Sequence, residues 1–506
     1  MGKSAKHSAI LIAAYITTSV LNYGFGVALS WFFKPEQFGV LGVAQSLLLL
    51  IALAVGSGFT WTAAHDLAAH GTNDVTRKRV RMAFAANALL GLALAGGVWL
   101  AYLENWLPLG PAYRVVVPLV GLTVFLLALR SVVNGAARGM YRFSQVAVNL
   151  VGEVLVKVIV GLALVKVGLG VSGVMLAFAA GAALSLLHSL WVVKPAHLWK
   201  GPGWFEPQVI AATAPLFAGM LGTALILNLD VLGLKLLAPS GQSDQLAGLY
   251  QAAVILARTP VFVAQALTLV LFTYAAGQAA KSQALGQAAS YTRNALRAWL
   301  RLLLPGGLVL ILAPGAALSI FFPAQYHAAR LALQIAAGGG VLLALVTLLT
   351  GVFQAEGQRR LPALAAGLGV VTQILVLITL VPRLGATGAA LSLLAASGVS
   401  LACLSPLLIS TAKDALQDKP FSWSVASAWA SRLGKELLPF AALVLPLIFI
   451  SLPGRQWALI RLGASGLSYL AAQMLTNRST LEKPLGRSRR PVVFVVSQVV
   501  QVLIGG

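Results

Sequence analysis

Long runs of apolar residues, separated by short polar breaks, recur along the chain from Ile10 to Leu475. A helix needs about 20 mostly apolar residues to cross the hydrocarbon core of a bilayer. The pattern therefore predicts an all-α integral membrane protein with about 14 transmembrane helices. The expected spans are 8–33, 40–62, 82–103, 115–136, 144–165, 170–193, 208–237, 247–274, 298–322, 328–353, 361–382, 387–411, 437–452 and 457–476.

The composition agrees with this class, because 59% of the 506 residues are apolar and only 10% are charged. Soluble domains carry roughly 25% charged residues. The net charge of +23 would suggest nucleic acid in a soluble protein. Here the basic residues stand between apolar spans and lack the interleaved aromatics of an RNA-binding surface. We therefore expect membrane lipids, and no nucleic acid, as partners.

The basic residues also predict the orientation of the chain. Most of the 36 Lys and Arg residues lie on one side of the expected topology, including Lys3, Lys6, the run 77–81 and the tail 478–490. Basic residues close to span ends are retained in the cytoplasm. We expect a multi-pass protein of the inner (cytoplasmic) membrane with both termini cytoplasmic.

The chain repeats itself, which predicts two related lobes. The recurring segments keep the same order: 169–176 resembles 384–391, 137–139 resembles 355–357, and 38–41 resembles 247–250. Parallel repeats of this kind place a substrate site between two lobes in several transporter folds. The expected parts are a six-helix lobe at 1–200, a second at 201–412, a cytoplasmic linker at 413–436, an extra helix pair at 437–476, and a basic, then Val-rich cytoplasmic tail at 477–506.

Motifs for covalent chemistry are absent from the sequence. There is no G-x-x-x-x-G-K-[ST] loop for nucleotide phosphates. His65 and His70 are five residues apart, which misses the i, i+4 spacing of a helical zinc site, and Cys403 is the only cysteine. The outer connections are too short for the catalytic loop of a glycan polymerase. We expect no enzymatic activity, no cofactor and no bound metal.

Ionisable residues inside spans are costly and are therefore candidates for function. Glu153 and Lys157 are four residues apart on one span, which suits either an internally neutralised pair or a pair that lines a cavity. Arg258 lies deep in its span and is followed by Pro260, which suits an anion site or pairing with an acid. The hairpin of two neighbouring spans would bring Asp230 toward Arg258 as a salt bridge.

For three other polar residues inside the spans, we expect simpler roles. Lys235 and Arg130 lie near span ends, from which their long side chains can extend to the membrane surfaces. His188 fits either a satisfied interior histidine or a proton relay.

Several short motifs together resemble one family. They are Asn-Leu-Asp-Val-Leu at 228–232, Gly-Leu-Tyr at 248–250, Ala-Arg-Thr-Pro-Val at 257–261, Phe-Gly-Val-Leu at 38–41 and Gln-Ala-Glu-Gly at 354–357. Their order, with the six-plus-six-plus-two layout, resembles the polysaccharide (O-antigen or exopolysaccharide) flippases of the multidrug/oligosaccharidyl-lipid/polysaccharide exporter superfamily.

The resemblance implies a function. Such a protein moves an undecaprenyl-diphosphate-linked oligosaccharide repeat unit across the bacterial cytoplasmic membrane by alternating access between two lobes. It implies a lipid-linked oligosaccharide substrate, with a glycan polymerase and other assembly proteins as candidate partners. On this interpretation Arg258 and Lys157 hold the anionic diphosphate, and Glu153, Asp230 and His188 tune the charge or couple transport to protons.

Alternative functions stay open at this point. A cation-coupled drug or small-molecule antiporter of the same superfamily is the main one, although residues 8–33 lack the acid that such antiporters often use. A peptidoglycan-precursor flippase would carry arginines in its first two helices, and the first two spans have none. A glycan polymerase lacks its external loop. The resemblance to a facilitator-type transporter is faint and is limited to Asp66, Gly71 and Arg77.

Overall fold

The computed structural model describes residues 3–194, 198, 207–239, 241–265, 267–268, 295–296, 298–355 and 360–416, and, further on, 439, 442–444, 457–460, 462–469 and 472. The chain divides into two compact units, Met1–Asp418 and Lys419–Gly506. The helices named in this section all belong to the first unit. The linker expected at 413–436 lies outside the described residues beyond 416, and the tail at 477–506 lies wholly outside them. The extra helix pair expected at 437–476 is described only in part.

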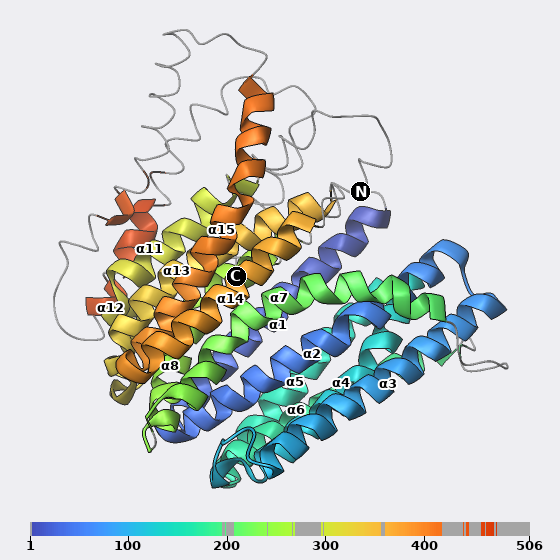
Figure 1. Cartoon of the computed structure of the whole chain (residues 1–506), viewed down its shortest axis with the longest axis horizontal. Helices are drawn as coiled ribbons and strands as arrows, with labels where there is room; N and C mark the ends of the chain where they lie inside the picture. The colour runs from blue at the N-terminus through green and yellow to red at the C-terminus, as the bar shows by residue number, and fades with distance from the viewer. Residues whose placement is uncertain are drawn as a thin grey trace. The chain divides into compact units, whose positions relative to one another are not determined.

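The first half of the unit is a bundle of helices with a 3-10 turn, η1 (Pro111–Tyr113) (Figure 1). Each of the first six predicted spans corresponds to one helix of this bundle. The helices are α1 (Lys3–Ser30), α2 (Pro35–His70), α3 (Asp74–Leu103), α4 (Val116–Gly139), α5 (Phe143–Lys166) and α6 (Gly170–Val193).

The second half follows the same plan with more breaks. Its described elements are α7 (Pro207–Leu237), α8 (Ser243–Ala257), the π-helical turn η3 (Trp299–Leu303), α11 (Leu304–Leu312), α12 (Pro314–Phe321), the 3-10 turn η4 (Ala324–Ala329), α13 (Arg330–Ala355), α14 (Arg360–Leu384) and α15 (Ala386–Leu416). In the described residues, 8 helices are long and apolar enough to cross a membrane, or up to 10 if each bent pair is one span. The all-α membrane fold is confirmed, and the count of 14 stays a prediction.

The neighbours of each helix repeat between the halves. α5 packs against α1 and α6 in the first half, as α14 packs against α7 and α15 in the second; α6 likewise contacts α4 as α15 contacts α13. Gly170 and Gly385, which occupy the same place in the repeated segments, both adopt φ +54° just before or at the start of a helix. This left-handed backbone favours glycine. The parallel repeat expected from short motifs is therefore present in the packing.

Two spans are bent where proline interrupts the backbone. α8 ends at Ala257, and the following helical piece Thr259–Gln265 turns away by 45°, as expected from Pro260, which has no amide hydrogen to donate. The span expected at 298–322 is not one straight helix. Its pieces Trp299–Leu312 and Pro314–Phe321 meet at 92°. The bend arises because Pro314 begins a new helix there.

The two lobes meet where α2 packs beside α7 and α8 (Figure 1). We call the end of the bundle that holds the α1–α2 and α7–α8 connections the Phe33 end, and the opposite end, with the run 77–81, the basic end. A Cβ on Gly39 would lie 1.8 Å from the carbonyl oxygen of Asp244, and a Cβ on Gly248 would lie 1.7 Å from that of Pro35. Each carbonyl stands four residues before the other glycine. This reciprocity is typical of a two-fold axis through the crossing.

Candidate substrate site

Asp230 and Arg258 form a buried ion pair in the second lobe. An Arg258 nitrogen lies 2.7 Å from Asp230 Oδ1, and the side chains are 8% and 0% exposed. Tyr250 donates its hydroxyl to Asp230 Oδ2 at 2.8 Å. The expected salt bridge is confirmed. Since a buried charge must be paired to be tolerated, this cluster ties α7 to the end of α8 and leaves Arg258 little surface for a ligand.

Glu153 does not form its ion pair with Lys157, its neighbour on α5. It pairs with Arg130 of α4, and Arg130 also donates to Ser185 Oγ of α6 at 3.3 Å. Both side chains of the pair are largely buried, with 17% of Arg130 and 21% of Glu153 exposed. The expectation that Arg130 extends to the membrane surface is therefore wrong, because a carboxylate at the same depth binds it.

Lys157 consequently forms no ion pair with an acid in the described part of the chain. Its ammonium donates to the side-chain oxygen of Asn22 on α1, and it lies 4.5 Å from the ring centroid of Phe178 on α6. Both partners are uncharged and suit a cation. Lys157 is half-buried near the middle of α5, whereas Asn22 is exposed.

His188 lies on α6, one turn beyond Ser185. The residue is half-buried, and its ring centroid is 6.1 Å from that of Trp191. The buried Nδ1 has no hydrogen-bond partner among the described residues. This position is compatible with either expectation for His188, and its proton-relay role stays a prediction.

A polar cluster joins the lobes at the Phe33 end. Tyr113, between α3 and α4, donates its hydroxyl to Asp244 Oδ1 of α8 at 2.8 Å. Lys235 of α7 donates to the same oxygen at 2.7 Å and lies 5.1 Å from the Tyr113 ring centroid. The Lys235 side chain is only 6% exposed. The expectation that it extends to the membrane surface is wrong, because Asp244 satisfies it inside the protein.

A second set of contacts lies beside this cluster. The Tyr326 hydroxyl and the Gln325 side-chain amide both donate to the Phe33 carbonyl, at 2.8 and 3.0 Å. The Trp31 indole donates to the Phe321 carbonyl at 3.1 Å. These hydrogen bonds between the two lobes all lie toward the Phe33 end. The lobes are therefore held together there.

Sequence reasoning missed several of these partners. Tyr250 belongs to the Gly-Leu-Tyr motif but carried no sign that its hydroxyl would reach Asp230. Asn22 gave a usable signal, since an amide in the middle of an apolar span is costly unless it has a partner. Nothing in the sequence linked Tyr113 to Asp244, which lie 131 residues apart.

Comparisons with known proteins agree with this architecture. A family model described as "Polysaccharide biosynthesis protein" matches residues 4–276. The chain belongs to this family. No curated protein sequence matches the chain at a significant level. The resemblance seen in the motifs is thus confirmed at the level of the family.

Solved structures that resemble this chain identify its fold. A "Lipid II flippase MurJ, inward closed conformation" has a TM-score of 0.70 at 15% identity and covers 94% of this chain and 100% of its own. A MATE multidrug transporter of the MOP superfamily in an inward-facing conformation has a TM-score of 0.61 at 13% identity, covering 82% and 100%. An outward-facing MATE structure has 0.59 at 12% identity, covering 81% and 96%. These neighbours are transporters and a flippase, not enzymes.

Proposed function

We propose that this protein is a flippase that moves undecaprenyl-diphosphate-linked oligosaccharide repeat units across the bacterial cytoplasmic membrane. Membership of the polysaccharide biosynthesis family and the flippase-like fold support this proposal. The observation that carries it is Lys157, a cation at mid-depth with no acid among its described partners. A diphosphate headgroup cannot cross hydrocarbon unaided, and a fixed cation on a hydrated path compensates its charge.

The buried charges receive separate roles in this proposal. Lys157 holds the diphosphate, and Asn22 and Phe178 orient the ammonium without neutralising it. Arg258 and Asp230 neutralise each other and keep the broken α8 against α7, so Arg258 supports the site without contacting substrate. Glu153 forms an ion pair with Arg130. From its position one helical turn before Lys157, its negative charge also affects the electrostatic potential at the ammonium.

The contacts between the lobes suggest which state of the transport cycle the structure represents. The hydrogen bonds at Phe33, Tyr113 and Asp244 hold the Phe33 end closed. With the basic end in the cytoplasm, as the positive-inside rule predicts, this is a state that is closed to the outside. Release on the outer face then requires that these contacts break, which is the alternating access expected of a two-lobed transporter. Both termini are cytoplasmic in this proposal.

Lys157→Gln tests the assignment, because it keeps the length and polarity of the side chain and removes its charge. In a strain that depends on this protein, we expect the lipid-linked repeat unit to accumulate on the inner leaflet with normal membrane abundance of the variant. Lys157→Arg should restore much of the transport. Lys166→Gln at the end of the same helix is the matched control and should behave as the wild type. Normal outer-leaflet delivery by Lys157→Gln would overturn the assignment.

Deletion of the gene distinguishes the proposed flippase from the alternative function, a cation-coupled antiporter. Deletion of an antiporter would alter drug sensitivity and leave the surface glycan normal. Deletion of the proposed flippase would remove the glycan and trap its precursor inside. A glycan polymerase as a protein partner stays a prediction.

A further inference from the structure

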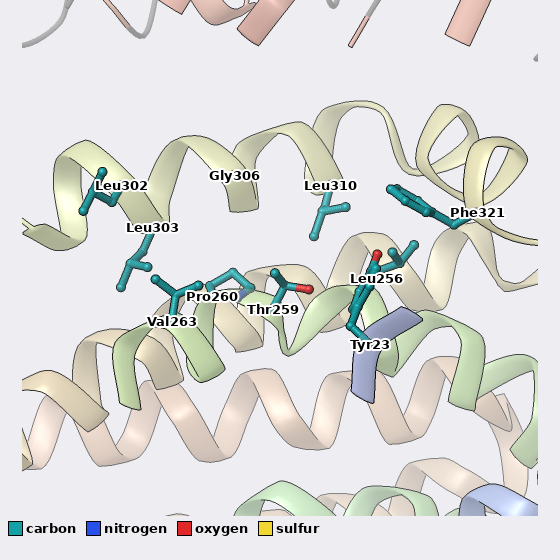
Figure 2. A pocket seen from close by; sticks show the side chains of 10 residues that line it. All are labelled: Tyr23, Leu256, Thr259, Pro260, Val263, Leu302, Leu303, Gly306, Leu310 and Phe321. Atoms are coloured by element: carbon teal, nitrogen blue, oxygen red, sulfur yellow. The ribbon is translucent and has the colours of Figure 1, made fainter. Parts of the chain in front are cut away.

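An apolar pocket lies between the two lobes beside the break in α8 (Figure 2). Its volume is about 210 Å³, and it is open to the surroundings on part of its wall. Its walls come from the broken α8, from η3 and α11, and from single aromatic residues of α1 and α12. Residues that define these walls are Pro260, Val263, Gly306, Leu310, Tyr23 and Phe321.

The pocket exists for two local reasons. α8 turns by 45° after Arg258, so Pro260 and the residues after it diverge from the line of the preceding helix. Gly306 on the facing wall has no side chain, and a Cβ added there would meet no atom within 4 Å. The space is therefore available to atoms from outside the protein.

The pocket is closed on one side and open on another. Tyr23 and Phe321 form an edge-to-face aromatic pair across the lobes, with ring centroids 5.8 Å apart. Val263 and Leu302, on the opposite part of the wall, are 42% and 40% exposed. Figure 2 shows Val263 and Leu302 toward one end of the pocket and Tyr23 with Phe321 toward the other. An elongated apolar group that enters along the exposed wall would therefore end against the aromatic pair.

The position of the pocket on α1 connects it to the cation site. Tyr23 follows Asn22, the residue that accepts the hydrogen bond from Lys157. Successive residues on an α-helix differ by about 100° around its axis and about 1.5 Å along it. Asn22, which contacts the Lys157 ammonium, and Tyr23, which lines the pocket, therefore lie on different faces of α1 at nearly the same depth.

We propose that this pocket binds the polyprenyl chain of the lipid whose diphosphate lies at Lys157. The inference rests on the proposed function and adds a second subsite to it. The polyprenyl chain is favoured over a bulk phospholipid chain because the pocket is adjacent to the only mid-depth cation without an acidic partner in the described residues. Hydrocarbon gains no transfer energy between bilayer and pocket. The pocket therefore acts by van der Waals packing and orients the chain away from the hydrated headgroup.

Gly306→Phe fills the pocket from the α11 wall, and Val263→Trp fills it from the open rim. Gly367→Phe on α14 is the matched control, because a Cβ there also meets no atom within 4 Å and the residue does not line the pocket. The probe is a polyprenyl diphosphate with a photoreactive group on its chain, added to purified protein in phospholipid bilayers. Thermal unfolding of each variant establishes that it is folded.

We expect wild-type adducts on the segments 256–263 and 302–310, and at least about fivefold fewer in both filled variants, with no change in Gly367→Phe. Excess unlabelled polyprenyl diphosphate should remove the adducts. Adducts that persist under this competition, or that are equal in the filled variants, would identify ordinary bilayer lipid and overturn the pocket assignment.

Lys157→Gln distinguishes failure of the pocket from failure of the proposed function. A chain-labelled polyprenol, which lacks the diphosphate, should label the pocket equally in the wild type and in Lys157→Gln. Labelling of the pocket in a protein that delivers no lipid to the outer leaflet would reject the flippase and keep the pocket. Delivery without labelling would reject the pocket and keep the flippase.

Discussion

Gly39 of α2 and Gly248 of α8 lie against each other at the Phe33 end, and the backbone of each helix occupies the space that a side chain on the other would need. The two residues hold matching positions in the internal repeat. The tight closure of the lobes at this end therefore depends on two glycines that serve the same purpose.

Gly39→Ala should open the Phe33 end. Its Cβ would lie 1.8 Å from the Asp244 carbonyl oxygen, so the helices must separate. With Cys403 replaced by Ser, we expect faster thiol labelling of Gln45→Cys, whose side chain lies at this contact. Gly24→Ala on α1, where a Cβ meets no atom within 4 Å, should leave the labelling rate unchanged. Equal rates in both variants would contradict this closure.

Tyr113→Phe should also shift the equilibrium between the closed and open arrangements of the lobes toward opening of the Phe33 end. It removes the hydroxyl that donates to Asp244 across the lobes. A hydrogen bond to a charged group contributes about 1.5–3 kcal/mol, so the ratio of closed to open molecules should fall by roughly tenfold or more. Distances between spin labels on α4 and α8 measure this ratio. Tyr102→Phe is the control, since its hydroxyl donates to Gly110 within one lobe.

Asp230→Asn should destabilise the protein, because it leaves Arg258 buried and without its carboxylate. Removing one partner of a buried pair costs about 3–5 kcal/mol. We expect a lower unfolding temperature and lower membrane abundance. The double variant Asp230→Leu with Arg258→Met should recover part of the stability, since no charge is then buried. A double variant that is less stable than the single one would assign Arg258 another partner.

Glu153→Gln should spare headgroup binding. It releases Arg130 from its ion pair and adds an unneutralised cation close to Lys157. We expect the affinity for a soluble diphosphate, measured by calorimetry, to be equal to or higher than that of the wild type, whereas Lys157→Gln loses binding. Weaker binding in Glu153→Gln would show that Glu153 contacts the diphosphate directly, and does not act only through its charge.

The apolar runs were sufficient to predict the helices of the first lobe to within about five residues, with two exceptions. α2 extends beyond its predicted span at both ends, and α3 begins at Asp74, well before its predicted start at 82. The bend of 45° after Arg258 followed from Pro260, but the turn of 92° before Pro314 did not, because proline at a helix start and proline within a helix look alike in a sequence. The apolar pocket beside Gly306 left no trace in the sequence either, since its walls come from helices that are far apart along the chain.

The sequence by itself determined the class of the protein, its repeat and the positions of its charged residues along the spans, because a bilayer demands long apolar helices whose backbone groups are satisfied internally. Only the tertiary structure decided which charges neutralise each other. Glu153 is four residues from Lys157 and binds Arg130, whereas Asp230 binds Arg258, as the hairpin of the two neighbouring spans suggested. Helix packing brings a third side chain to the same depth, and the nearest carboxylate in space is then no longer the nearest one in sequence. For that reason Lys157 is left without an ion pair in the part of the chain that the structure describes.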